Sequence, residues 1–217
     1  GKGMNSGRIS LVPSDGCADP GDQVILGNTC LYGATGGELF ALGRAGERFG
    51  VRNSGARAVV EGAGDHCCEY MTGGVVAVLG STGRNVGAGM TGGVAFLLDE
   101  GDRVTPRVNF EIVEVCSITT AEQESMLKGL LEGHLAATGS SKASALLADW
   151  DAAKSRFKLL VPPSERAVIV HVDQQAAAAR IDRLTCPGSS NTKPLPLQRW
   201  PCRSSSGGLT SRPIGAG

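Results

Sequence analysis

Four adjacent residues, His66–Glu69 (His-Cys-Cys-Glu), are the first candidates for chemistry, because imidazole, thiolate and carboxylate groups bind transition metals. Neighbouring residues on a strand point to opposite faces, so four in a row cannot converge on one ion without a bulge. Cys67 also occupies one column of an internal repeat together with Cys30, Phe49 and Val86. We therefore expect core packing and an interdomain contact here rather than a metal site.

A glycine motif at Gly87–Gly92 fits G-x-G-x-x-G, the pattern of dinucleotide-binding loops. That loop needs a helix N-terminus after it, so that the helix dipole faces the pyrophosphate. The residues that follow, Gly93–Leu98, form a short apolar run that predicts a strand. The sequence therefore predicts a turn at this motif and no nucleotide site.

Two further patterns are weaker. Ser125 and Lys128 have the S-x-x-K spacing of penicillin-recognising enzymes, but they lie inside a predicted helix without the companion motifs. Asp149 and Asp151 are two residues apart on a helix and face different ways. We predict no catalytic, cofactor-binding or metal-binding residue in this chain.

Composition excludes several classes of protein. Basic and acidic residues balance at 21 each, so no overall field favours nucleic acid or a membrane surface as partner. No apolar run is long enough to span a bilayer, and Gly1–Leu11 lacks the apolar core of a signal peptide. The seven cysteines include no C-x-x-C pair. We therefore expect reduced thiols and a cytoplasmic protein.

The first hundred residues hold 23 of the 32 glycines and form an internal repeat. Its marker glycines are 19, 18 and 19 residues apart, and eight residues after each stands a small polar residue. Gly3–Gly7 fits the same frame and adds a coil, while Pro13–Gly21 is an inserted loop. The marker glycines are Gly27, Gly46, Gly64 and Gly83, and the polar residues are Thr35, Ser54, Thr72 and Thr91.

Alternation after each polar residue predicts which side chains face inward. Positions four and six residues further on are apolar in every coil, whereas intervening positions include Arg8, Glu38 and Arg57, which must be solvated or face another domain. Coils stack at about 4.8 Å, so Cys30 and Cys67, two coils apart, should not form a disulfide. The first column is Ile9, Leu39, Ala58, Val76 and Ala95; the second is Leu11, Ala41, Val60, Val78 and Leu97.

These patterns predict an all-β fold with appended α-helices, in three parts. Residues 1–118 should form a single-stranded β-helix of about five coils of 18–19 residues, including one further strand around Ile112–Val115. A left-handed hexapeptide β-helix fits less well, because the apolar period here is two. Residues 119–163 should form a helical pair, one from the capping box at Thr119–Glu122 to Gly139 and one from Ser141 to Phe157. Residues 164–217 are expected to be a disordered, low-order tail, unstructured from Leu184 onward.

The stretches Gly27–Gly37, Val51–Ala56, Val60–Gly62, Gly64–Gly74 and Gly87–Gly93 together resemble the C-terminal glycine-rich (GXGXG) domain of the glutamate synthase large subunit. The resemblance covers about residues 1–165, and we find none in 164–217. The glycine-rich subunit of formylmethanofuran dehydrogenase shares the repeat but not the string from His66 to Met71. The resemblance implies that the β-helix is right-handed and that its role is architectural.

The resemblance also implies a parent oxidoreductase that makes glutamate from glutamine and 2-oxoglutarate. Its glutaminase and FMN-barrel domains, with FMN and an iron–sulfur cluster, precede this segment, so no functional residue carries over and the segment itself holds no cofactor. Ferredoxin or an NADPH-oxidising small subunit could supply the electrons. The alternative is a free-standing binding or assembly module that shares the repeat.

Overall fold

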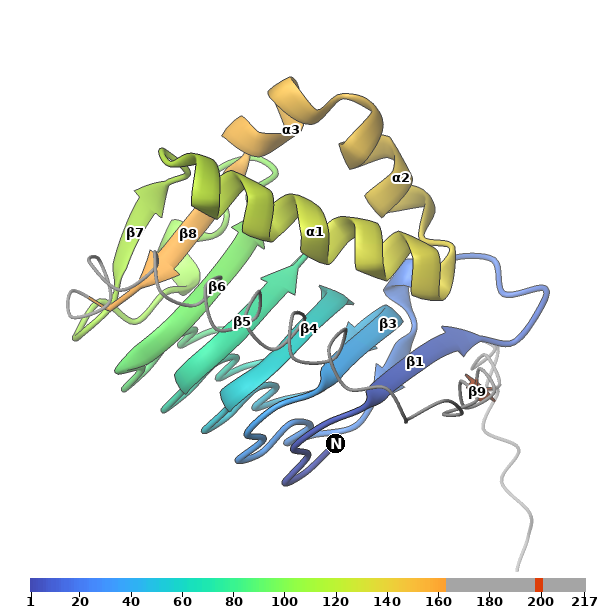
Figure 1. The fold of residues 1–217 in the computed structure, drawn as a ribbon, viewed down its shortest axis with the longest axis horizontal. Coiled ribbons are helices and arrows are strands. Elements are labelled where there is room, and N and C mark those ends of the chain that lie inside the picture. Colours follow the sequence, from blue (N-terminus) through green and yellow to red (C-terminus); the bar gives the residue numbers. More distant parts are fainter. Residues whose placement is uncertain (163–197, 201–217) are drawn as a thin grey trace, which may run out of the picture.

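The computed structural model describes residues 1–162 and 198–200 of the chain. Five parallel strands stack side by side in chain order along one wall of a solenoid, and the chain returns from each strand to the next through turns on the other side (Figure 1). The predicted β-helix is confirmed. Its strands are β1 (Arg8–Pro13), β3 (Glu38–Ala45), β4 (Ser54–Gly62), β5 (Thr72–Val78) and β6 (Gly92–Leu98). The inserted loop ends in a one-turn 3-10 helix, η1 (Pro20–Asp22), and is followed by β2 (Val24–Leu26), which pairs with β3.

The strand register confirms both inward columns. Ile9 pairs with Leu39, which continues through Ala58 and Val76 to Ala95, and the column that begins at Leu11 follows two residues on. These side chains belong to one buried core inside the solenoid, against which Ile9 is only partly buried. Stacking closes this core, because a single coil has too few neighbours to bury its own apolar edge.

The opposite face of the same strands carries a second core. Arg8, Glu38 and Arg57 are exposed or half-buried, but two residues further on Phe40 and Val59 are buried and Ser10 is half-buried. Helix α1 (Ala121–Thr138) crosses this face of the sheet (Figure 1). The intervening positions are therefore not all solvated, and the predicted helix packs on the β-helix itself. The second core includes Phe40, Val59, Ala77, Phe96, Met126, Leu127, Leu130 and Leu131.

Glycine allows the close approach of neighbouring coils. A Cβ added at Gly55 or Gly73 would overlap the backbone carbonyl of Thr35 or Ser54 in the preceding coil. Both glycines directly follow a polar marker residue of the repeat. Glycine follows these markers because a side chain would not fit against that carbonyl.

The capping box of α1 is one residue later than expected. Thr120 accepts a hydrogen bond from the Gln123 amide, and the Gln123 side chain accepts one from the Thr120 amide. The box is therefore Thr120–Gln123 instead of Thr119–Glu122, since glutamine serves at the third position as well as glutamate. Gly139 ends the helix as predicted, with a left-handed φ of 70°.

The second predicted helix is wrong beyond Ser155. The chain forms α2 (Ser141–Ala148) and α3 (Trp150–Ser155), and Phe157–Val161 is a strand, β8. Strand β8 pairs antiparallel with β6 and with β7 (Glu114–Ser117). Strand β7 follows the 3-10 turn η2 (Thr105–Arg107) and begins two residues later than the strand expected around Ile112–Val115. Antiparallel pairing with β6 closes the end of the solenoid, and this long-range contact is absent from the local pattern.

Two expectations about the termini and cysteines also change. A short strand, β9 (Gln198–Trp200), pairs parallel with β1, so this part of the expected unstructured tail is ordered. The rest of the tail lies outside the described residues. Cys17 is disulfide-bonded, contrary to the expectation of reduced thiols, whereas Cys30, Cys67, Cys68 and Cys116 are free. The absence of a Cys30–Cys67 bridge is confirmed.

The turns opposite the strands share one backbone pattern, and we call them arms (residues 28–34, 47–53, 65–71 and 84–90). In each arm three residues at alternate positions have positive φ, for example His66 at 61°, Cys68 at 60° and Tyr70 at 54°. In the arms 47–53 and 65–71 the outer two donate their amides to the next coil, and the middle one donates to the previous coil. The arms are therefore hydrogen-bonded across coils without being strands.

Candidate functional site

The structure places Gly87–Gly92 in a turn. Gly87 and Gly89 adopt left-handed φ values of 72° and 64°, and strand β6 begins at Gly92. No helix N-terminus follows the motif, so it lacks the strand–turn–helix arrangement of a dinucleotide-binding loop. The predicted turn is confirmed.

In the arm that holds His66–Glu69, two of the four side chains face the core and the other two face outward. Alternating φ signs turn both Cys67 and Cys68 inward, where they are fully buried with their Sγ atoms 3.7 Å apart. The expectation that this segment is a strand with alternating faces is therefore wrong. The hydrogen bond with Cys67 and burial raise the pKa of the Cys68 thiol well above its usual value. A thiol held protonated in this way is a poor metal ligand.

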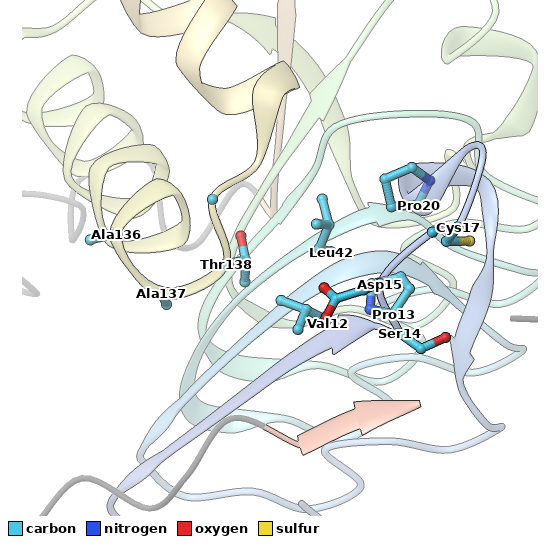
Figure 2. Close-up of a pocket in the computed structure, with 12 residues that line it drawn as sticks. Val12, Pro13, Ser14, Asp15, Cys17, Pro20, Leu42, Ala136, Ala137 and Thr138 are labelled. Carbon is cyan, nitrogen blue, oxygen red and sulfur yellow. The ribbon is translucent and has the colours of Figure 1, made fainter. Parts of the chain in front are cut away.

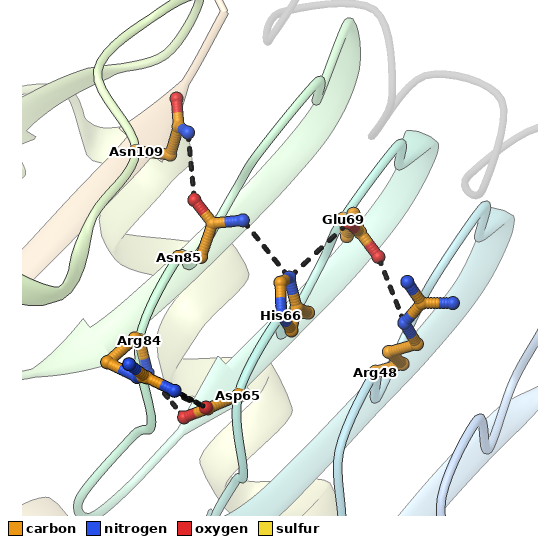
Figure 3. A network of polar contacts seen from close by, with 7 residues as sticks. All are labelled: Arg48, Asp65, His66, Glu69, Arg84, Asn85 and Asn109. Carbon is orange, nitrogen blue, oxygen red and sulfur yellow. Dashed lines mark hydrogen bonds and ion pairs between the residues drawn. The ribbon is translucent and has the colours of Figure 1, made fainter.

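His66 and Glu69 lie on the outer side of the arm within a polar network (Figure 3). The side-chain amide of Asn109 donates to Asn85 Oδ1 over 2.8 Å, and Asn85 Nδ2 lies 3.0 Å from His66 Nδ1. Because the Asn85 oxygen is already occupied by Asn109, its nitrogen faces the ring, so Nδ1 accepts. This chain of contacts spans three successive coils.

Ion pairs extend the same network. Glu69 pairs with Arg48 of the preceding coil, with Glu69 Oε2 3.4 Å from Arg48 Nε. Glu69 Oε1 lies 3.4 Å from His66 Nδ1, a contact that becomes an ion pair only when the imidazole is protonated. Asp65 accepts the backbone amide and the guanidinium of Arg84, and these contacts lower the pKa of the Asp65 carboxyl (Figure 3). Within the described residues, no group of three or more His, Cys, Asp or Glu side chains could hold a metal ion. The network ties coils together.

A second polar cluster was missed by sequence reasoning. Glu61 on β4 accepts from Ser140 Oγ at 2.5 Å, and the same oxygen, Oε1, lies 3.0 Å from His134 Nε2. His134 and Ser140 are completely buried, and Glu61 is 6% exposed. The available signal was a histidine within the apolar stripe of α1, three residues after Leu131.

Glutamate, histidine and serine together are the residue types of a catalytic triad, but their arrangement here is not one. A nucleophilic serine must donate to the imidazole, whereas the Ser140 hydroxyl donates to Glu61. Ser140 also caps α2 by accepting the Ala143 amide. The cluster therefore joins β4 to the end of α1 and the start of α2.

The two weaker patterns also have structural roles. Ser125 and Lys128 are exposed on α1, and the Lys128 ammonium lies 5.9 Å from the ring centroid of Trp150. Asp151 forms an exposed ion pair with Lys154, while Asp149 is exposed at the boundary between α2 and α3. Neither pair converges on a common site.

A cavity of about 460 Å³ lies between the inserted loop and the end of α1 (Figure 2). Its described lining includes Asp15, Ser14 and Thr138 but no lysine, arginine or histidine. It therefore lacks a cation that could bind a phosphate or carboxylate group.

The comparisons with known proteins agree with this architecture. Residues 1–163 match the family described as the GXGXG motif. The chain belongs to the GXGXG family. The resemblance of this GXGXG domain to glutamate synthase is confirmed, and no helix of the described residues is long and apolar enough to cross a membrane.

Three relatives show how much of a longer protein the GXGXG domain represents. The chloroplastic ferredoxin-dependent glutamate synthase of Spinacia oleracea is 52% identical over 191 residues, which are 88% of this chain and 11% of that protein. Ferredoxin-dependent glutamate synthase 2 of Synechocystis sp. is 58% identical over 167 residues (76% and 11%). Ferredoxin-dependent glutamate synthase 1 of Arabidopsis thaliana is 57% identical over 166 residues (76% and 10%). The chain thus spans about a tenth of these relatives, and the spinach match includes residues beyond Ser164.

Proposed function

We propose that this chain is a non-catalytic, architectural domain of a ferredoxin-dependent glutamate synthase. The observation that carries the proposal is the high identity to proteins of that name over three quarters of the chain, which accounts for only about a tenth of each relative. A segment of that size would function as one part of the longer protein, together with its remaining domains.

The polar residues support an architectural role. His66 and Asn85 link one coil to the next, Glu69 pairs with Arg48 of the preceding coil, and Glu61 holds two helices to the sheet. None of these groups lines the cavity beside the inserted loop. Polar groups occupied in this way stabilise and orient the fold.

The chemistry then belongs to the rest of the parent protein. Its glutaminase domain would release ammonia from glutamine, and its FMN barrel, with an iron–sulfur cluster, would form glutamate from 2-oxoglutarate. These two domains are the proposed partners of this segment, which itself would hold no cofactor. The names of the relatives favour ferredoxin over an NADPH-oxidising small subunit as electron donor.

Location is part of the same proposal. Several relatives are named as chloroplastic. We propose a cytoplasmic protein, or the equivalent soluble compartment of a plastid, with neither nucleic acid nor membrane as partner. Cell fractionation with an antibody to this chain tests the location, and recovery in a washed membrane pellet would contradict it.

An assay of the chain beside its parent tests the catalytic part. The purified chain, given glutamine, 2-oxoglutarate and reduced ferredoxin, should form no glutamate and should show no flavin absorbance. The parent enzyme should do both. Glutamate formation by the chain alone would refute the proposal. A start codon directly before Gly1, in place of an in-frame barrel, would support the free-standing module instead.

A further inference from the structure

One column of the arms contains side chains that the fold does not require. The third positive-φ position of successive arms is Gly33, Arg52, Tyr70 and Gly89. Equivalence follows from the hydrogen bonds, since Gly33 donates to Val51, Arg52 to Glu69 and Tyr70 to Ala88. Glycine occupies two of these four positions, so the backbone can be built without a side chain there.

Arg52 and Tyr70 adopt φ values of 53° and 54°, where a residue with a Cβ is strained. At other positive-φ positions in the arms, such as Leu31 and Cys68, burial in the core offsets the backbone strain. At His66 and Asn85 the hydrogen bond between their side chains offsets it. Arg52 is exposed and Tyr70 is 52% exposed, so burial does not fully offset the strain at either residue.

The Tyr70 ring is held in place although half of it is exposed. A Cβ built at Gly89 would overlap ring atoms Cδ1 and Cε1 of Tyr70, so the ring lies directly against that glycine. An exposed aromatic ring fixed by packing loses little entropy when a partner covers it. Tyr32, 36% exposed, lies beside this column two coils before Tyr70.

Arg52 places a charged residue at the equivalent position of the arm before Tyr70. It forms no ion pair within the described residues, whereas Arg48 and Arg84 in neighbouring positions are paired with carboxylates. Tyrosine and arginine are enriched among residues that dominate binding energy at protein interfaces. The column therefore has the composition and the fixed geometry of an interface.

We propose that Arg52 and Tyr70 form a docking surface for another domain of the same parent polypeptide. This inference rests on the proposed function, under which about nine tenths of the protein lies outside this segment, as the relatives' lengths indicate. The complementary surface offers a carboxylate to Arg52 and a flat apolar group to Tyr70.

Hydroxyl-radical footprinting of Tyr70 tests whether this surface is covered. Its oxidation rate in the full-length parent should be at least fivefold lower than in this chain alone, with oxidation of free tyrosine as the dose control. Equal rates in an active parent enzyme would overturn the docking surface while leaving the proposed function intact. A rate in the isolated chain that rises on dilution would show that a second copy covers Tyr70, and would also overturn it.

Replacement of Arg52 separates docking from folding. Arg52→Gly removes the strain at φ 53°, so the melting temperature of the isolated chain should not fall and should rise by up to about 3 °C. In the parent, the same change should raise Tyr70 oxidation at least threefold. The matched control is Asp102→Gly, an exposed residue at φ 56° outside the arms, which should leave Tyr70 oxidation in the parent unchanged. Equal effects of the two variants on Tyr70 in the parent would refute the proposal.

Discussion

The buried cluster around Glu61 permits a quantitative test of how the helices are attached to the solenoid. Glu61→Ala removes the one oxygen that accepts from both His134 and Ser140. Both partners are completely buried, so each is left with an unsatisfied donor. An unsatisfied buried donor costs roughly 1–3 kcal/mol, and relief of carboxylate desolvation offsets part of the sum.

We therefore expect Glu61→Ala to destabilise the chain by about 2–5 kcal/mol. At about 2–4 °C per kcal/mol for a protein of this size, the melting temperature should fall by roughly 5–20 °C. Glu61→Gln is the matched control, because its amide oxygen still accepts from both donors. The glutamine variant should lose only the extra strength of hydrogen bonds to a charged acceptor, so its free energy of unfolding should fall by about 1 kcal/mol.

Thermal and urea unfolding followed by circular dichroism measure these changes, and amide exchange locates them. Exchange in Glu61→Ala should accelerate most at the end of α1 and the start of α2, the elements that the cluster joins to β4. Equal losses for the alanine and glutamine variants would show that the charge, and not the shared acceptor, matters. A loss below about 1 kcal/mol for alanine would refute the assigned role altogether.

Three other predictions concern the solenoid. Val78→Asp places a carboxylate in the inner core and should cost at least about 3 kcal/mol, whereas Arg57→Asp, at a half-buried outer position, should cost about 1 kcal/mol or less; equal thermal melts would contradict the assigned faces. Gly73→Ala should cost more than about 2 kcal/mol because its Cβ overlaps a carbonyl, while Gly129→Ala on α1, with open space around it, should stabilise by about 0.5–1 kcal/mol; urea titrations giving the same sign for both would count against the close-approach argument. Because the pKa of Asp65 is lowered in the folded chain, its ionised form adds stability at pH values above the ordinary pKa of 3.8, and this stability is lost as the pH falls through the folded pKa. The difference in melting temperature between the native chain and Asp65→Asn should therefore be present at pH 7 and vanish by about pH 2. A difference that persists at about pH 2 would refute the assignment.

Much of the solenoid could be predicted because its information is local and repeated. Each coil carries the same polar marker, followed by a glycine and two inward apolar positions, so Val60 could be assigned by comparison with Val78 and Leu97. Stacking turns these equivalent positions into ladders, and an error in one coil would conflict with the others. The repeat alone therefore determined the strands, their register and the inner core.

The arms show where local reasoning was insufficient. Cys67 and Cys68 are adjacent, and a strand would have separated them onto opposite faces. Alternating left-handed residues bring both inward, and this backbone is stabilised by hydrogen bonds to the coils before and after it. Side chains such as Tyr70 tolerate positive φ only within that stack, so residue type gave no reliable signal.

The elements outside the repeat depend on tertiary contacts for their final form. Phe157–Val161 becomes a strand because β6 and β7 offer it two open edges, although the preceding residues predict a helix. Glu61 and His134 are 73 residues apart and belong to elements of different period, so no pattern in the sequence connects them. Sequence alone determined the coils, because each coil repeats the constraint on its neighbour. Only the tertiary structure decided what covers their outer face, because the contact between α1 and that face occurs once and leaves no repeating pattern in the sequence.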